Sequence, residues 1–159
     1  KIIVAAGGKK LSNAQRSQLK AYALIIGKNW ERVLAEATFK YAGSVHKDLE
    51  KIQTIIDAKG KVSKALNAYI KHWGELKGFS LALQTGNKKL GATASKLNRL
   101  IGAGPVMPGN TQVARIDKQG NYVREKSMPL KGYMGEMVGV QKLMISRFGV
   151  KARNKDVTQ

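Results

Sequence analysis

The 159-residue chain has no cysteine and only three prolines, two histidines and ten acidic residues. Without cysteine it forms no disulfide, no thiolate metal site and no cysteine nucleophile. No apolar run reaches the ~18 residues of a membrane-spanning helix, so we expect no membrane span. The chain also lacks a Gly-rich phosphate loop, a Gly-x-Ser-x-Gly elbow and a His-Glu-x-x-His zinc helix. We therefore identify no catalytic residues and favour a non-catalytic role, although enzymatic activity stays open.

The scarcity of acidic residues leaves a large positive charge. Lys and Arg number 29, which gives a formal net charge of +19. A field of this size attracts polyanions and acidic partners. The cations are mostly lysines spread along the whole chain, and the sequence shows neither an arginine-rich helix nor an aromatic stacking platform. Nucleic acid and an acidic protein therefore both stay open as partners.

Hydrophobic residues make up 43% of the chain, enough for the core of a single domain. The stretch Ser12-Asn13-Ala14-Gln15 is a typical capping box, so we expect a helix to begin there. Apolar residues then keep a helical period as far as Ile56, which predicts one unusually long helical run that Gly27 and Gly43 bend without ending. This series comprises Leu19, Tyr22, Ala23, Ile26, Trp30, Val33, Leu34, Ala37, Tyr41, Val45, Leu49, Ile52 and Ile56.

The remainder of the chain predicts shorter elements. Ser63 is expected to cap a second helix that ends at Gly86, and Pro129 to start a last helix that ends at Gly149. A third helix is expected at 94–101, and a small hairpin in the 105–126 loop. We therefore predict an all-α helical bundle with this plan: a lead-in at 1–11 whose glycines block early helix formation, the bundle at 12–149 and a flexible tail at 150–159.

The strongest candidate site is the pair His72 and Glu75. At this spacing both side chains leave the same face of a helix, so they can share a proton, a metal ion or a buried partner. Glu36 or Glu31, from the long helix, would add a further oxygen ligand for a divalent cation. The alternative is a buried His–Glu pair that satisfies its own polar groups and fixes helix register.

The second histidine is interpreted differently. His46 has the acidic residues Asp48 and Glu50 close by in the sequence, with lysines next to them. A mixture of both charges at this density is typical of a solvated helix face. We therefore place His46, Asp48 and Glu50 on the surface.

Three stretches together resemble a known family. A Trp-Glu helix at 29–42, the His-x-x-Glu helix at 71–84 and a Gly-Pro stop at 100–105 follow one another as in the C-terminal half of imelysin-like proteins. The resemblance covers about residues 12–148. It implies an all-α fold, export to the periplasm, and a role in iron or haem uptake; a peptidase label also accompanies the family. The family's first His-x-x-Glu motif has no counterpart here.

Together these features predict an exported helical domain that binds or acquires iron, another divalent metal or a small ligand. The alternative is a basic module that binds nucleic acid or an acidic protein. A long helix with an apolar face would pack against more than the three shorter helices this chain supplies. We therefore expect an acidic protein partner, such as the N-terminal half of the same precursor.

Overall fold

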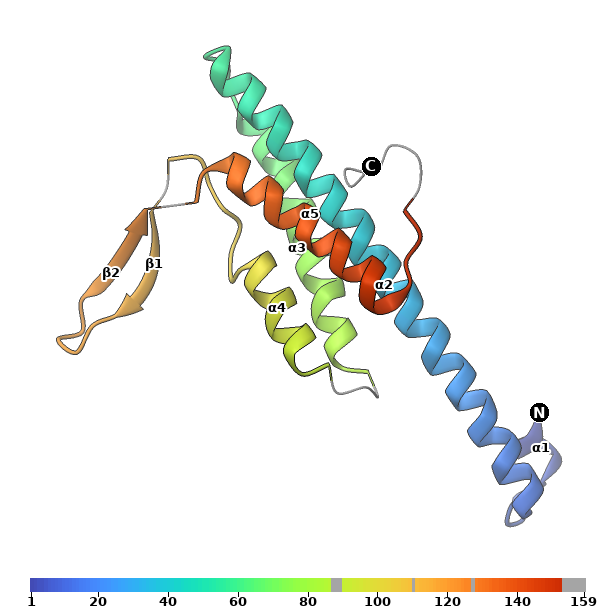
Figure 1. Ribbon diagram of the computed structural model, residues 1–159. Helices are drawn as coiled ribbons and strands as arrows, with labels where there is room; N and C mark the ends of the chain where they lie inside the picture. Colours follow the sequence, from blue (N-terminus) through green and yellow to red (C-terminus); the bar gives the residue numbers. More distant parts are fainter. Residues whose placement is uncertain (87–89, 110, 127, 153–159) are drawn as a thin grey trace.

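Figure 1 shows the computed structural model, which describes residues 1–86, 90–109, 111–126 and 128–152. The described residues form five helices and one antiparallel hairpin, which confirms the predicted all-α bundle with a long helix and a small hairpin. The elements are α1 (Ile2–Ala5), α2 (Asn13–Asp57), α3 (Ser63–Gln84), α4 (Ala92–Ile101), β1 (Thr111–Ile116), β2 (Tyr122–Lys126) and α5 (Leu130–Phe148).

Helix α2 begins as the capping box predicts. The backbone N–H of Gln15 donates to Ser12 Oγ over 3.2 Å, and the backbone N–H of Ser12 donates to Gln15 Oε1 over 2.9 Å. The helix continues through Gly27 and Gly43 to Asp57 without a break. A short turn, in which Lys59 takes a positive φ of 54°, then reverses the chain into α3.

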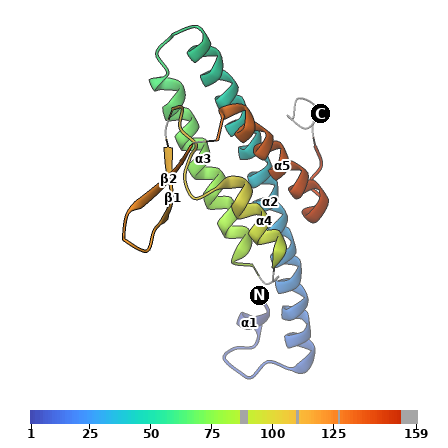
Figure 2. The same cartoon turned by 60° about the vertical axis from the view of Figure 1, so that its left-hand side comes forward.

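The core lies where α3 and α5 pack against two sides of α2, with α4 covering α3 and α5 (Figures 1 and 2). Fully buried aliphatic residues of α2, among them Leu49 and Ile52, belong to one core cluster with Leu76 of α3 and methionines of α5. Met137 and Met144 are both fully buried, so methionines of α5 form part of the core. Burial of such side chains contributes about 1.5–3 kcal/mol each.

Three local predictions need correction. Residues 2–5 form one turn of helix, α1, before the lead-in glycines. Ser63 is the first residue of α3 rather than its cap, because Val62 occupies the cap position. Val150, which was assigned to the flexible tail, is buried against the core. In the same predicted tail Lys151 is exposed, Ala152 packs partly buried against the core, and 153–159 lie outside the described residues.

The N-terminal part of α2 departs most from expectation. Its apolar residues were predicted to continue the buried face, yet Ile26 is 67% exposed and Trp30 is 64% exposed. One reason is that α3 ends at Gln84 and α5 at Phe148, so α2 extends beyond both of them (Figure 1). Ile26 also lies on another side of α2 from the buried Ala42. We call residues 13–33 of α2 the projecting segment. None of the helices described is long and apolar enough to cross a membrane.

Candidate functional site

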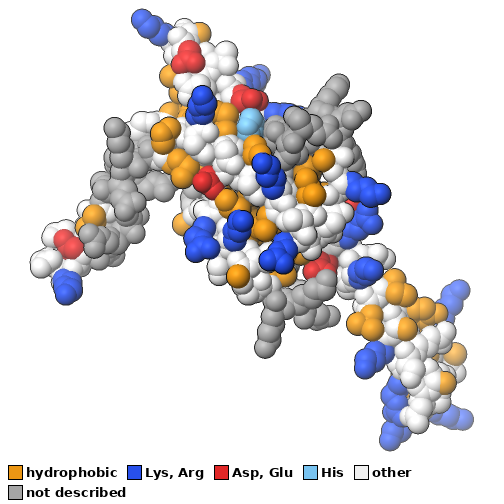
Figure 3. Space-filling view, viewed as in Figure 1, with side chains coloured by type: hydrophobic (Ala, Val, Ile, Leu, Met, Phe, Trp, Pro, Cys, Tyr) orange, Lys and Arg blue, Asp and Glu red, His pale blue; other side chains and the backbone are white. Residues whose placement is uncertain are grey.

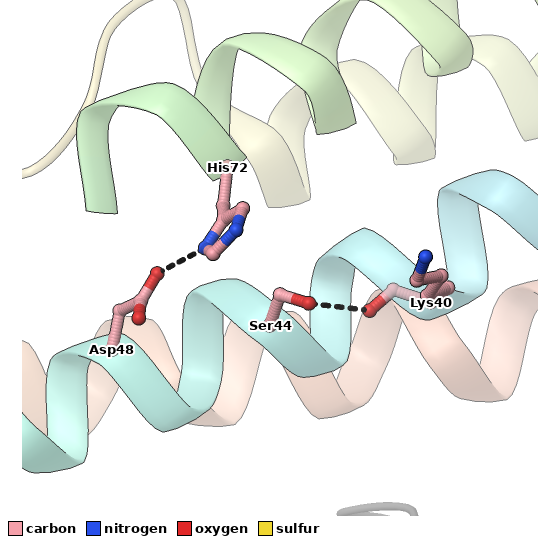
Figure 4. Close-up of polar contacts among 4 residues, drawn as sticks. All are labelled: Lys40, Ser44, Asp48 and His72. Carbon is pink, nitrogen blue, oxygen red and sulfur yellow. Dashed lines mark hydrogen bonds and ion pairs between the residues drawn. The ribbon is translucent and has the colours of Figure 1, made fainter. Parts of the chain in front are cut away.

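His72 lies on the face of α3 that packs against α2. Its Nδ1 is 2.6 Å from Oδ2 of Asp48, which reaches across from α2 (Figure 4). The side chains are 31% and 17% exposed, respectively, so the contact is partly shielded from water. Beside it, the Tyr41 ring lies 6.1 Å from the imidazole and stacks on Phe79 at 5.5 Å between ring centroids. The histidine therefore ties α3 to α2 beside an aromatic contact.

The other predicted ligands do not gather around His72. Glu75 is half-buried one turn further along α3, whereas Glu36 pairs with Arg32 on α2 at 3.1 Å. Glu31 borders the same hollow as Leu83, which is roughly three turns along α3 from His72. In the described part of the chain no three His, Asp or Glu residues form a group that could hold a metal ion. The iron site stays a prediction.

Asp48 was assigned to a solvated face, and this interpretation is wrong. The position of the predicted turn could have indicated the contact. When a turn centred on residue 60 joins two antiparallel helices, residues equally distant from it in the sequence lie opposite each other. Asp48 and His72 are each twelve residues from that centre. His46 was also misplaced: its side chain is mostly buried, and its Nδ1 lies 3.6 Å from Glu50 Oε2.

A second polar cluster holds the end of α4 against α3 and α5. The Tyr133 hydroxyl donates to the carbonyl of Ile101 over 2.6 Å and accepts the indole N–H of Trp73 over 2.8 Å. The Tyr69 hydroxyl donates to the carbonyl of Val106 over 3.0 Å. Burial raises the pKa of both tyrosines above the usual value, so both hydroxyls stay neutral donors. Their role is structural.

The projecting segment carries both apolar and basic side chains. Five apolar residues at helical spacing form one stripe along it: Leu19, Tyr22, Ile26, Trp30 and Val33. Leu24 and Ile25, also exposed, leave the helix on other sides. On the face seen in Figure 3, cations are spread over the bundle and lie beside hydrophobic side chains along this segment. Residues 1–33 contain seven Lys and Arg residues and one acidic residue.

Two hollows open where α2 leaves the bundle. The α3-side hollow, about 450 Å³, is lined by Leu24, Gly27, Lys28, Trp30, Glu31, Leu34, Ala82, Leu83 and Gly86. The α5-side hollow, about 510 Å³, is lined by Ile25, Lys28, Asn29, Glu31, Arg32, Arg147, Phe148 and Gly149. Both hollows flank the base of the projecting segment, which sequence reasoning had placed in the core.

Comparisons of the chain with protein-family models, with curated proteins and with solved structures found no match. The candidate sites are therefore the His72–Asp48 contact and the projecting segment with its two hollows.

Proposed function

We propose that this chain is a basic helical module that binds an acidic protein partner along the projecting segment. The observation that supports the proposal is the exposure of large apolar residues on several sides of a helix that extends beyond its own bundle. A helix that is apolar on several sides is characteristic of a protein interior, not of a surface that stays in water. A partner that covers the segment would complete the bundle.

The charge of the segment specifies the partner. Burying its six half-exposed or exposed apolar residues would contribute on the order of 5–10 kcal/mol. Association itself costs roughly 4–15 kcal/mol, so apolar contact alone would give weak binding. Acidic groups facing the seven nearby cations would steer the encounter and select the partner. A second copy of this chain, at +19, would instead be repelled.

Nucleic acid fits the projecting segment less well. Phosphates would engage its lysines and arginines, but would leave Leu24, Ile25 and Ile26 in water. Proteins that bind single strands stack bases on aromatic side chains, and the exposed surface of this segment is mostly aliphatic. An acidic protein satisfies both the apolar and the basic residues.

Site-specific photo-crosslinking in cells of the native source tests the proposal. A benzophenone amino acid replaces Ile26 in the stripe or, as the control, Ile70, which is exposed on α3. We expect position 26 to cross-link one acidic polypeptide and position 70 not to do so. When the cross-linking is repeated in a cell lysate, the yield should fall as salt rises, because exposed charge pairs are screened over about 8 Å at physiological ionic strength. Cross-links from position 26 to nucleic acid, or equal labelling from both positions, would contradict the proposal.

A metal- or ligand-binding role in an exported imelysin-like protein is the second candidate. The His72–Asp48 contact favours it, because a carboxylate on one ring nitrogen orients the other nitrogen as a ligand in many metal sites. Calorimetric titration of the chain with Zn²⁺ or Fe²⁺ distinguishes the two candidates. We expect at most weak binding, because a stable site needs further ligands. Tight stoichiometric binding that His72→Ala abolishes would favour the metal role instead.

A further inference from the structure

The α3-side hollow has the chemistry of an anchor pocket. Its walls are mainly apolar, formed by Leu24, Trp30 and Leu34 of α2 with Ala82 and Leu83 of α3. Its volume of about 450 Å³ lies within the range of sites that enclose a small organic group. Helical partners commonly fill such a groove with a large apolar side chain.

The α5-side hollow favours a carboxylate. Lys28, Arg32 and Arg147 line it together with one acidic residue, Glu31, and the apolar side chains of Ile25 and Phe148. Arg32 already pairs with Glu36 on its own helix. Within the described residues, the side chains of Lys28 and Arg147 make no hydrogen bond or ion pair. An incoming carboxylate would thus meet two cations that the bundle itself does not use.

One binding element can reach both hollows. Leu24 and Ile25 are consecutive in α2 and open onto different hollows, and Lys28 lines both. Leu24 also lies on the same face of α2 as the buried Ala42, five helical turns later. A helix laid over this face would continue the core layer beyond the ends of α3 and α5.

Building on the proposed docking function, we infer that the partner is an acidic amphipathic helix anchored at these two hollows. It inserts a large apolar side chain into the α3-side hollow and sets a carboxylate, within one turn of that anchor, against Lys28 and Arg147. Charge complementarity selects this occupant: a second copy would bring cations to cations, and an anionic membrane would cover one face of α2 without filling a hollow.

Selection from a phage library of ~18-residue helical peptides, about five turns each, tests the inference on the full chain. We expect enriched peptides to carry Asp or Glu within one turn of a single Leu, Phe or Trp. Ala82→Trp fills the α3-side hollow and should weaken their binding about tenfold, as loss of a central anchor does. Leu81→Trp, at the neighbouring exposed position outside the hollow, is the matched control and should leave the affinity unchanged.

Two further variants keep the result interpretable if Ala82→Trp folds poorly. Leu24→Ala removes an exposed wall of the same hollow and should also weaken binding. Lys28→Glu should weaken it far more than Lys71→Glu, which makes the same charge change on the exposed surface of α3. All affinities are compared by fluorescence anisotropy at one salt concentration.

Several outcomes would overturn the inference. The selection could enrich no helical peptide, or only neutral or basic ones. It could also enrich acidic peptides whose affinity is unchanged by both Ala82→Trp and Leu24→Ala. Reversible dimerisation of the chain through these hollows, seen by sedimentation, would also overturn it. These outcomes can be distinguished from failure of the proposed docking of an acidic protein on the projecting segment, which the cross-linking experiment tests separately. If position 26 still cross-links an acidic protein, docking along the segment stands and only the assignment of the anchor is wrong.

Discussion

Replacing Gly43 of α2 by alanine should destabilise the chain, although alanine usually favours a helix. Gly43 is buried, and a Cβ at this position would lie 2.8 Å from Nε2 of Gln141 on α5. That amide is 1% exposed and donates to the carbonyl of Phe39 over 3.2 Å. The added methyl group therefore forces the amide away from its acceptor in a site that water does not reach.

The magnitude follows from two opposing effects. Alanine in place of glycine inside a helix stabilises by about 0.5–1 kcal/mol. Loss of a buried hydrogen bond that leaves its partner unsatisfied costs about 1–3 kcal/mol. Gly43→Ala should therefore lower the free energy of unfolding by about 1 kcal/mol. Gly74 of α3 is exposed with open space around it, so Gly74→Ala should raise the free energy of unfolding by about 0.5–1 kcal/mol.

Urea denaturation followed by circular dichroism measures both effects, and a double-mutant cycle isolates the cause. In a Gln141→Ala background the amide is absent, so Gly43→Ala should become neutral or stabilising. The expected coupling between the two positions is about 1 kcal/mol or more. If Gly43→Ala stabilises the chain equally with and without Gln141, the packing argument is refuted.

Three further predictions concern the other contacts. His72→Ala and Asp48→Ala should each lower the free energy of unfolding, measured by urea denaturation, by about 1–2 kcal/mol. If the double variant loses the sum of the two single effects, the two residues do not interact directly. Because burial raises the pKa of Tyr69 and Tyr133 in the folded state, the native chain holds these protons longer and its stability should fall as pH rises above about 10. In a variant with both Tyr69→Phe and Tyr133→Phe, the free energy of unfolding should fall less steeply above this pH. An unchanged slope would contradict the raised pKa of the two tyrosines. Ile26→Ser should change thermal stability by less than about 0.5 kcal/mol, since this side chain is exposed, yet reduce partner binding.

The helices of this fold were predictable because their signals are local. The capping box at Ser12, the apolar period of α2 and the glycine after α5 each act within a few residues of the chain. The hairpin was predictable for the same reason: Asp117 caps the turn by accepting the backbone N–H groups of Gln119 and Asn121. Such features do not depend on where the other helices pack.

To predict the candidate site, one needs to know how the residues of α2 and α3 align with each other. The apolar period within a single helix does not give this alignment. His72 and Glu75 share a face of α3, but that face meets whichever α2 residues lie equally far from the turn. Tyr41 and Phe79 stack because each is nineteen residues from residue 60, and Asp48 meets His72 by the same rule. Glu36 would lie opposite the end of α3 under this rule. Turn position, more than residue chemistry, decides which carboxylate reaches the histidine.

Periodicity also cannot tell which molecule buries an apolar face. The stripe from Leu19 to Val33 repeats at helical spacing, as the α2 core residues do, but it lies on another side of the helix from Leu24 and the buried Ala42. Spacing alone does not show that α3 and α5 both end where α2 leaves the bundle, so that neither of them covers the projecting segment. A chain that maintains an apolar pattern past the end of its own packing partners leaves that surface in water unless another molecule covers it. The surplus of cations on the same segment favours a negatively charged molecule as the one that covers this apolar surface. Charge and periodicity together therefore argue for an acidic protein partner, whereas neither does so alone.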